Sequence, residues 1–314
     1  MRAQLTGKFL ATVAASATAT GAGNAVAADF VAADPVAIDS RITIAFEGGV
    51  SQSDIDDDKL GSSDKLGDHD ADIYGAISLT KLISPDIDWR LSGAYHAGSD
   101  RSWEFSTIGT DPAVDFSLGD DFDFQTIDFD IGKRLQMSQA QVRIFGGLRG
   151  LHVKENFNFG LGVTPSDPTT DKTTSLDKVG SSDFYGIGPR IGAEVYYPLG
   201  ETWGLSGSAA AAAIWGRRST DLGFNLVTND PGDPDPQPET INVPISEDSD
   251  EVITNLEFKA GVTWMPWDTT AFTVGYRIDH WDSLLSGFSG LTGDDDGDQN
   301  QTFHGPFLKV EVKL

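Results

Sequence analysis

The feature that most constrains this chain is an alternation of apolar and polar residues that recurs along most of its length. Between residues 86 and 96, for example, Ile87 and Leu91 share one face of an extended segment, while Asp88 and Arg90 share the other. Side chains alternate between the two faces of a β-strand, so a period of two predicts strands with one apolar and one polar face.

Ten segments follow this pattern, and the connectors between them alternate in length. The segments are residues 41–50, 70–83, 86–96, 122–135, 139–156, 183–198, 202–218, 255–266, 271–279 and 303–314. The connectors are short at 84–85, 136–138, 199–201 and 266–268, and long at 51–69, 97–121, 157–182, 219–250 and 282–301. Tight turns on one side and long loops on the other are typical of an outer-membrane β-barrel, whose chain then begins and ends on the short-turn side.

A soluble β-sandwich or a lipocalin-like barrel is the alternative, and its apolar face would point inward. The segments are longer than the ~5–6 residues of a common soluble strand, and charged residues recur on one face only. Trp89, Trp203 and Trp264 lie near segment ends, as in the aromatic girdles of membrane barrels. We therefore predict an all-β fold, a transmembrane antiparallel up-and-down β-barrel of about ten strands with short periplasmic turns and long acidic extracellular loops. Two further strands within 97–121 or 157–182 would make twelve.

The N-terminal segment has the features of a secretory signal peptide. Arg2 and Lys8 supply its positive region, an Ala-rich apolar stretch follows, and residues 25–27 fit a small-x-small cleavage site. No other stretch reaches the roughly 18 apolar residues of a membrane helix. We expect export to the outer membrane of a Gram-negative cell. The predicted organisation is a signal peptide at 1–27, a periplasmic lead-in at 28–40 and the barrel at 41–314.

Charge and cysteine content exclude several functions. The chain has 48 Asp and Glu against 22 Lys and Arg, a formal net charge of −26, and no cysteine. Nucleic-acid phosphates require a basic surface, so we expect no nucleic-acid partner. Without cysteine, disulfides, thiolate metal sites and Cys nucleophiles are excluded. Most of the acidic excess falls in the long connectors, which predicts a vestibule that concentrates cations.

If the apolar faces meet lipid, the polar faces line the lumen. Barrels of about eight strands are filled by side chains, whereas 16 to 18 strands leave an aqueous channel, so ten would leave a tight passage at most. Two interpretations stay open: the charges pair and fill the space, or they form an eyelet that sets ion selectivity. The candidate lining residues are Asp88, Arg90, Asp128, Asp130, Arg143, Arg149, Arg190, Glu194, Glu257, Lys259, Arg277 and Lys309.

Metal binding and catalysis have weaker support. Acidic runs at 54–58 and 294–298 offer oxygen ligands for Ca²⁺ but lack the EF-hand register, so we interpret them as solvated loops and predict no metal and no cofactor. Asp279, His280 and Asp282 could form an acid–base protease site. No G-x-S-x-G or H-E-x-x-H motif accompanies them, and we expect no enzymatic activity. The proline-rich stretch 231–244 predicts an extended loop.

Several motifs resemble those of one family. Residues 183–192, Asp-Phe-Tyr-Gly-Ile-Gly-Pro-Arg-Ile-Gly, resemble the F-x-G-x-G-P-R-x-G strand of the Legionella-type major outer membrane protein family. The segment from Trp203 to Arg217 resembles its small-residue strand that ends in an aromatic residue, Gly and Arg, and 127–132 resembles its D-x-D-x-G strand. The resemblance covers about residue 122 to the C-terminus. It implies a pore-forming outer-membrane barrel without enzymatic activity or cofactor.

Two departures from that family and its fold matter. Members known for disulfide cross-linking carry cysteines, so any homo-oligomer of this chain would form without disulfides. Most outer-membrane barrels end in Phe or Trp, whereas this chain ends in Leu314, which weakens the expected assembly signal.

The combined expectation is a porin-like protein that lets ions or small solutes diffuse passively, with mild cation selectivity. Its expected partners are outer-membrane lipids and those ions or solutes. Two alternatives stay open: a narrow or closed structural barrel that binds a surface partner through its acidic loops, as an adhesin does, or an outer-membrane protease.

Overall fold

The computed structural model describes residues 42–55, 72–98, 101–106, 113–164, 173–229, 239–285 and 299–314. These residues form β1 (Ile42–Ile55), β2 (Asp72–Leu82), β3 (Ile87–Ala97), β4 (Arg101–Ser106), β5 (Ala113–Met137), β6 (Ala140–Thr164), β7 (Thr173–Pro198), β8 (Trp203–Asn229), β9 (Glu239–Trp267), β10 (Thr270–Leu285) and β11 (Gln299–Lys313). The predicted signal peptide and lead-in lie outside the described residues. Within the described part, no helix is long and apolar enough to cross a membrane.

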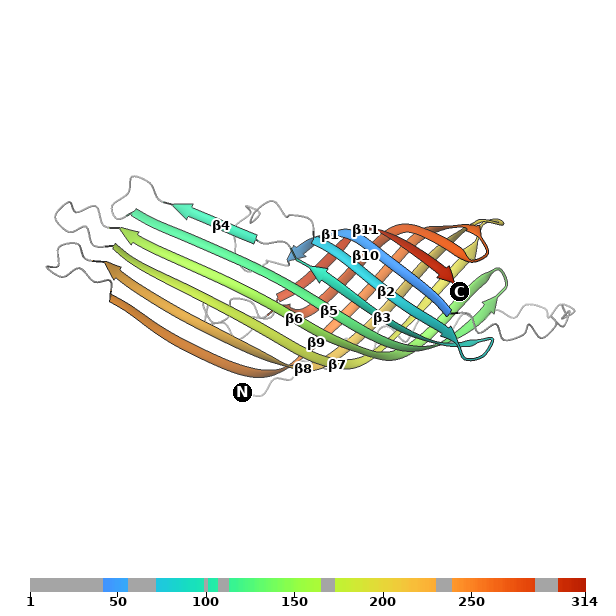
Figure 1. Ribbon diagram of the computed structural model, residues 1–314, viewed down its shortest axis with the longest axis horizontal. Coiled ribbons are helices and arrows are strands. Elements are labelled where there is room, and N and C mark those ends of the chain that lie inside the picture. The colour runs from blue at the N-terminus through green and yellow to red at the C-terminus, as the bar shows by residue number, and fades with distance from the viewer. Residues whose placement is uncertain are drawn as a thin grey trace, which may run out of the picture. The chain divides into compact units, whose positions relative to one another are not determined.

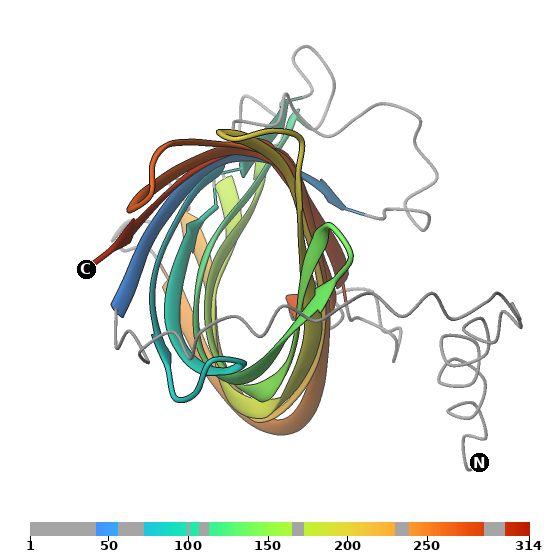
Figure 2. The same ribbon diagram turned by 90° about the vertical axis from the view of Figure 1, so that its right-hand side faces the viewer.

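The strands close into an antiparallel barrel (Figures 1 and 2). Their order is β3-β2-β1-β11-β10-β9-β8-β7-β6-β5-β4, and a further pairing of β3 with β5 joins the two sides. Ten strands therefore form the closed ring, while β4 pairs only with the first part of β5. The prediction of a ten-stranded up-and-down barrel is confirmed.

The short connectors all lie at one end of the barrel. They are residues 83–86, 138–139, 199–202 and 268–269, at the four positions predicted. The first and last strands meet at this end, because Thr43 pairs with Lys313 and the Leu314 N–H donates to the Ile42 carbonyl over 2.8 Å. The predicted arrangement of turns and termini is confirmed, and we call this end the turn end.

Five strands are longer than predicted, so part of each connector predicted at 97–121, 157–182 and 219–250 is strand. β5 to β9 continue past the closed ring as a sheet that we call the extension, on the left in Figure 1. The extension comprises residues 113–121, 157–164, 173–182, 219–229 and 239–250. Its acidic and small residues have a loop-like composition, but the backbones remain paired strand to strand. Of the stretch 231–244, residues 239–244 belong to β9, and 230–238 lie outside the described residues.

The barrel wall is apolar outside and polar inside. Leu91, Phe129 and Leu148 point outward with 45–50% of their surface exposed, whereas Asp88 and Asp130 are fully buried at 0%. A soluble barrel would show the reverse, because burial of apolar surface is what stabilises a fold in water. Among the exposed aromatic residues, Trp203, Trp264 and Trp267 lie at the turn end of this apolar band and Tyr185 and Trp215 at the other end, whereas Phe129 and Phe258 lie between the two edges. The outward face is therefore a lipid-facing surface.

Gly188 marks a close approach of two wall strands. The β7–β8 ladder is interrupted at Gly188 and Pro189, since proline has no N–H to donate. A Cβ atom on Gly188 would lie 1.8 Å from the Ala213 carbonyl oxygen, which is backbone and cannot move aside cheaply.

We expect Gly188→Val to prevent β7 and β8 from pairing. The folded barrel should resist unfolding by SDS without heating and migrate differently from the boiled form, and the variant should lose this heat-modifiable band. Gly75→Val is the matched control, because a Cβ there meets nothing within 4 Å. Equal heat-modifiability of the two variants would contradict the prediction.

Candidate functional site

The lumen contains a cavity of about 820 Å³, which we call the chamber. Pro85, Gln136 and Asp268 line it at the turn end. Phe124 and Trp281 line it at the opposite end. The chamber therefore reaches from the periplasmic turns into the barrel interior.

The structure brings eleven of the twelve candidate lining residues together at the chamber wall. Every second residue of each strand faces inward, so the alternation placed them on the correct face. Asp88 does not line the chamber. It is fully buried, and its carboxylate accepts hydrogen bonds from Arg134 Nε at 2.7 Å and Arg143 Nε at 2.8 Å.

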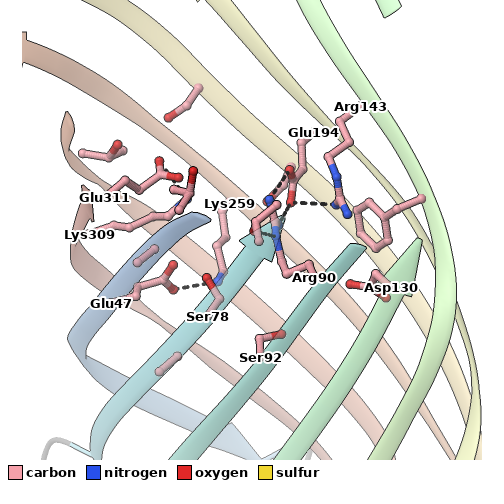
Figure 3. Close-up of a pocket in the computed structure, with 18 of the residues that line it drawn as sticks. Glu47, Ser78, Arg90, Ser92, Asp130, Arg143, Glu194, Lys259, Lys309 and Glu311 are labelled. Atoms are coloured by element: carbon pink, nitrogen blue, oxygen red, sulfur yellow. Dashed lines mark hydrogen bonds and ion pairs between the residues drawn. The ribbon is translucent and has the colours of Figure 1, made fainter. Parts of the chain in front are cut away.

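Three ion pairs cross the lumen. Arg90 on β3 binds both carboxylate oxygens of Glu194 on β7, and Lys259 Nζ on β9 donates to Glu47 on β1 over 2.6 Å (Figure 3). Arg149 on β6 lies 3.3 Å from Glu257 on β9 and also donates to Asn255. In each case the two strands are three positions apart around the ring, so the side chains span the interior and do not merely link neighbours.

Shorter pairs complete the network. Arg149 donates to both oxygens of Asp128 at 2.7 and 2.8 Å, and Arg190 donates to Asp130 at 2.6 Å. Arg277 lies over the Tyr74 ring, 3.7 Å from its centroid, which is a cation–π contact. These contacts join inward-facing residues of neighbouring and distant strands alike.

The chamber lining is balanced in charge. Nine acidic side chains face nine basic ones. The set consists of Glu47, Asp86, Asp128, Asp130, Glu194, Glu257, Asp268, Asp279 and Glu311, with Arg90, Arg134, Arg143, Arg149, Arg190, Lys259, Arg277, Lys309 and Lys313. Sequence reasoning missed seven of these eighteen as lining residues, and the same alternation places at least Glu47, Glu311 and Lys313 of the seven on the polar face.

Above the chamber, apolar side chains fill the lumen. This set, the apolar layer, consists of Phe122, Phe124, Leu151, Val153, Phe184, Ala212, Ile214, Ile253, Trp281, Leu284, Leu285 and Phe303. None of them has more than 7% of its surface exposed, so water does not reach this level of the described barrel. The sequence contains a signal for this layer that the alternation alone did not reveal: these residues are apolar at inward-facing positions that elsewhere carry charge.

The last residues of β10 contribute to the apolar layer, and the backbone there is irregular. The β10–β11 register shifts between Trp281 and Leu285, and Ser283 has a φ of 61°. This left-handed conformation is uncommon for a residue with a side chain. It breaks the alternation, so that the consecutive Leu284 and Leu285 are both buried.

Arg218 holds this irregular segment in place. Its Nη2 donates to the Ser283 carbonyl at 3.3 Å and to the Leu284 carbonyl at 2.9 Å. Its Nε donates to Glu251 at 2.6 Å, and the side chain is only 2% exposed. The guanidinium thus ties β8 and β9 to the inward-bent end of β10.

Of the three residues proposed for an acid–base site, His280 and Asp282 meet, whereas Asp279 lies on the other face of β10. Asp279 faces inward, is 1% exposed, and accepts a hydrogen bond from Asn255 at 2.6 Å. His280 points to the other face of β10, where its ring nitrogens lie 2.8 Å from Thr302 Oγ1 and 3.1 Å from Asp282. Adjacent residues of a strand have opposite orientations, so Asp279 cannot orient the His280 ring.

No group of three or more His, Asp or Glu within the described residues could hold a metal ion. The acidic run 294–298 lies outside the described residues, as does 56–58 of the first run.

Beyond the barrel, the outward face of the extension is acidic. Arg217 Nη2 donates to Asp248 at 2.7 Å. A hydrogen bond from Ser219 and this contact with Arg217 lower the pKa of Asp248, so the carboxylate stays ionised at neutral pH. Ionised side chains on this face place the extension in water and not in lipid.

A family model, the Legionella pneumophila major outer membrane protein precursor, matches residues 83–314. No curated protein matches the sequence significantly.

Several solved structures show weak similarity. The outer membrane protease OmpT from Escherichia coli is 14% identical over 88% of this chain and 94% of its own, with a TM-score of 0.40. A major outer membrane protein from Thermus thermophilus is 10% identical over 88% and 100%, with a TM-score of 0.33. The attachment invasion locus protein Ail of Yersinia pestis is 11% identical over 88% and 99%, with a TM-score of 0.27.

Proposed function

The chain belongs to the Legionella pneumophila major outer membrane protein family, and from this premise we propose that it is a porin-like channel for small ions or solutes, closed above its chamber in the conformation described. The observation that carries the proposal is the polar chamber of about 820 Å³ inside a ten-stranded ring. A barrel with a purely structural role has no need of such a space. The outward apolar band supports outer-membrane lipids as the other partner.

The lining chemistry suits the passage of ions. Most charged side chains that reach into the chamber have a partner of opposite charge, and an acidic side chain such as Asp128 contacts two basic ones. An ion that enters the chamber can contact these charged side chains one after another, so that they replace its hydration shell step by step.

The apolar layer supports a gated channel. Hydrophobic constrictions close a pore by excluding water, and ions then cross only when the constriction widens. We therefore propose brief openings that require the layer, including Leu284 and Leu285, to move aside.

Mild cation selectivity is part of the proposal and has its origin outside the chamber. The balanced lining favours neither sign, whereas the whole chain carries a net charge of −26. Acidic surface near the mouth raises the local concentration of cations and lowers that of anions. The effect should weaken at high salt, because screening shortens the range of the field.

Reconstitution of the refolded protein in planar bilayers tests this function. We expect discrete, small conductance steps in potassium chloride and a reversal potential that favours potassium across a salt gradient. A reversal potential that favours chloride would contradict the selectivity. A correctly folded, heat-modifiable barrel that stays silent, even when the apolar layer is loosened, would contradict the channel.

The extension supports a second candidate, a surface-binding barrel. It places five paired strands outside the ring, with β4 as a sixth along the β5 edge, which is more structure than a pore needs. A silent barrel that retains specific binding through the extension would favour this function over the first.

A further inference from the structure

The outward face of β10 carries a chain of hydrogen-bonded side chains that the proposed channel does not use. Thr302 Oγ1 on β11 lies 2.8 Å from His280 Nδ1 on β10. His280 Nε2 lies 3.1 Å from one carboxylate oxygen of Asp282, and the other oxygen accepts a hydrogen bond from Thr254 on β9 over 2.6 Å. Three neighbouring strands thus bring a hydroxyl, an imidazole and a carboxylate together.

The carboxylate sets the direction of every hydrogen bond in this chain. A carboxylate can only accept, so the His280 ring donates from Nε2 to Asp282, and Nδ1 is left as an acceptor. The Thr302 hydroxyl therefore donates to Nδ1. A hydroxyl that donates to an imidazole, with a carboxylate on the second ring nitrogen, has the connectivity of a nucleophile, its general base and the group that orients the base.

The backbone holds the base and its partner in place. His280 is paired with Thr302 in the β10–β11 ladder, and its carbonyl accepts a hydrogen bond from Asn255 Nδ2 at 3.2 Å. The register of this ladder shifts after Trp281, so Asp282 is the first residue of the irregular segment. Irregularities of this kind re-aim side chains and are common beside active sites.

The cluster lies at the edge of the lipid-facing band that is remote from the turn end. Phe258 and Ile278 are opposed one row closer to the turn end on the same face, and they are 50% and 42% exposed. The side chains of His280 and Asp282 are 36% and 47% exposed, so both are reached from outside the barrel. Acyl chains that pack against the apolar row bring their ester groups to this level, because the interfacial region of a bilayer directly follows the hydrocarbon core.

A donor for the charge that develops on an ester oxygen is present on β1. Gln52 pairs with His304 and is therefore the diagonal neighbour of Thr302 on the same face. Such neighbours lie about 7–8 Å apart, which a long side chain can span. The Gln52 side chain is exposed, and its amide can donate to the oxyanion of a tetrahedral intermediate.

We propose that Thr302, His280 and Asp282 form a catalytic triad that hydrolyses acyl esters of membrane lipids. Thr302 Oγ1 bonds to the ester carbonyl carbon while its proton passes to His280 Nδ1. The bond from that carbon to the alcohol oxygen then breaks, and the alcohol leaves with the proton. A water molecule, deprotonated by the same nitrogen, attacks the acylated threonine, releases the fatty acid and returns the hydroxyl. One ester and one water thus give one alcohol and one carboxylic acid, while Asp282 and Thr254 act as positioning residues.

The site is independent of the channel, because it faces lipid and not the chamber. It also has no local sequence motif, since Thr302 is 22 residues from His280 and the two meet only where β11 pairs with β10. The predicted absence of enzymatic activity depended on local motifs, which do not detect an arrangement of this kind.

Release of fatty acids from defined vesicles tests the proposal. The refolded barrel is inserted into phospholipid vesicles with deuterated acyl chains, with or without unlabelled lipid A, and free fatty acids are measured by mass spectrometry. We expect release that increases with the amount of barrel, and the isotope shows whether glycerophospholipid or lipid A is the source. No release from either lipid above that of protein-free vesicles would overturn the proposal, whatever the conductance of the same protein.

Matched variants separate catalysis from a structural role. Thr302→Val keeps the shape and removes the hydroxyl, and His280→Ala removes the base, so each should lower the release at least about 100-fold. Thr302→Ser should retain it. His304→Ala is the control, because this second outward imidazole is bound to the Tyr276 hydroxyl over 2.6 Å and should be dispensable. All variants should keep the heat-modifiable band and the conductance of the parent. Equal release by Thr302→Val and the parent, or equal loss in His304→Ala and His280→Ala, would count against the triad.

A covalent probe tests the nucleophile in the unmodified chain. Hexadecanesulfonyl fluoride forms a sulfur–oxygen bond with an activated hydroxyl and loses fluoride, and the modified residue is located by mass spectrometry of peptides. We expect modification of Thr302 and a parallel loss of fatty-acid release. Thr254 is the internal control, because it donates to Asp282 and not to the imidazole. An unmodified Thr302, or equal modification of both threonines, would reject Thr302 as the nucleophile even if a variant failed to fold.

Discussion

Replacement of Arg149 by methionine should lower the free energy of unfolding by about 3–5 kcal/mol, the usual cost of removing one partner of a buried ion pair. The Arg149 guanidinium is 3% exposed and binds both oxygens of Asp128 and one of Glu257. Methionine fills part of the space but removes the shortest charge contacts of two buried carboxylates, leaving Asp128 with Arg190 at 3.6 Å and Glu257 with Lys259 at 3.5 Å. Urea unfolding of the refolded barrel in lipid vesicles, followed by tryptophan fluorescence, measures the change.

Two controls separate the loss of charge compensation from a general effect of the substitution. Arg217→Met removes a side chain that is 67% exposed and pairs with Asp248 outside the barrel, so it should cost less than about 1 kcal/mol. A triple variant adds Asp128→Asn and Glu257→Gln to Arg149→Met. It removes the two carboxylate charges that Arg149 compensates and should restore a large part of the stability. A triple variant less stable than the single one would show that packing, and not charge, dominates at Arg149.

The second large effect concerns the apolar layer. Leu284→Ser with Leu285→Ser should raise the single-channel conductance several-fold and lengthen the openings, because hydroxyl groups let water enter a level that is dry in the described conformation. Planar-bilayer recordings of the variant and the parent protein in the same salt measure the change. Leu199→Ser is the matched control, since Leu199 lies in a periplasmic turn with 59% exposure and should leave conductance unaltered.

Arg218 offers an independent test of the same layer. Arg218→Met removes the hydrogen bonds to the Ser283 and Leu284 carbonyls while it keeps an apolar stem. We expect more frequent openings than in the parent, with a smaller rise in conductance than in the double serine variant, because the leucines remain present. If both variants fold and conduct no better than the parent, the apolar layer is not the barrier to ions.

Residue patterns predicted the barrel but not its length. The alternation located all ten wall strands and the turn end, because the bilayer demands one apolar face on every strand that crosses it. It failed at the extension, where Asp221 and Asp248 occupy the outward face. Once the strands leave the lipid, their outward face becomes polar. The apolar–polar alternation therefore ends there, although the strands remain paired.

The candidate site shows a similar division. Alternation placed Arg90, Glu194 and Lys259 in the lumen, but it contains no information on which inward residue meets which. Arg90 and Glu194 are 104 residues apart, and Lys259 and Glu47 are 212 apart. Only closure of the ring brings residues so far apart in the sequence into contact. Asp88, predicted as a lining residue, is instead enclosed by Arg134 and Arg143, because its place in the ring sets it against two long basic side chains.

The amino-acid sequence by itself determined the strands, the face that meets lipid and the polar character of the interior, since each depends on neighbours within a few residues. The tertiary structure decided whether that interior is open. Side chains from β5 to β11 meet in the apolar layer, and ion pairs between strands three positions apart cross the chamber. Both arise from the diameter and register of the closed ring, which are properties of all ten strands together and of no segment alone.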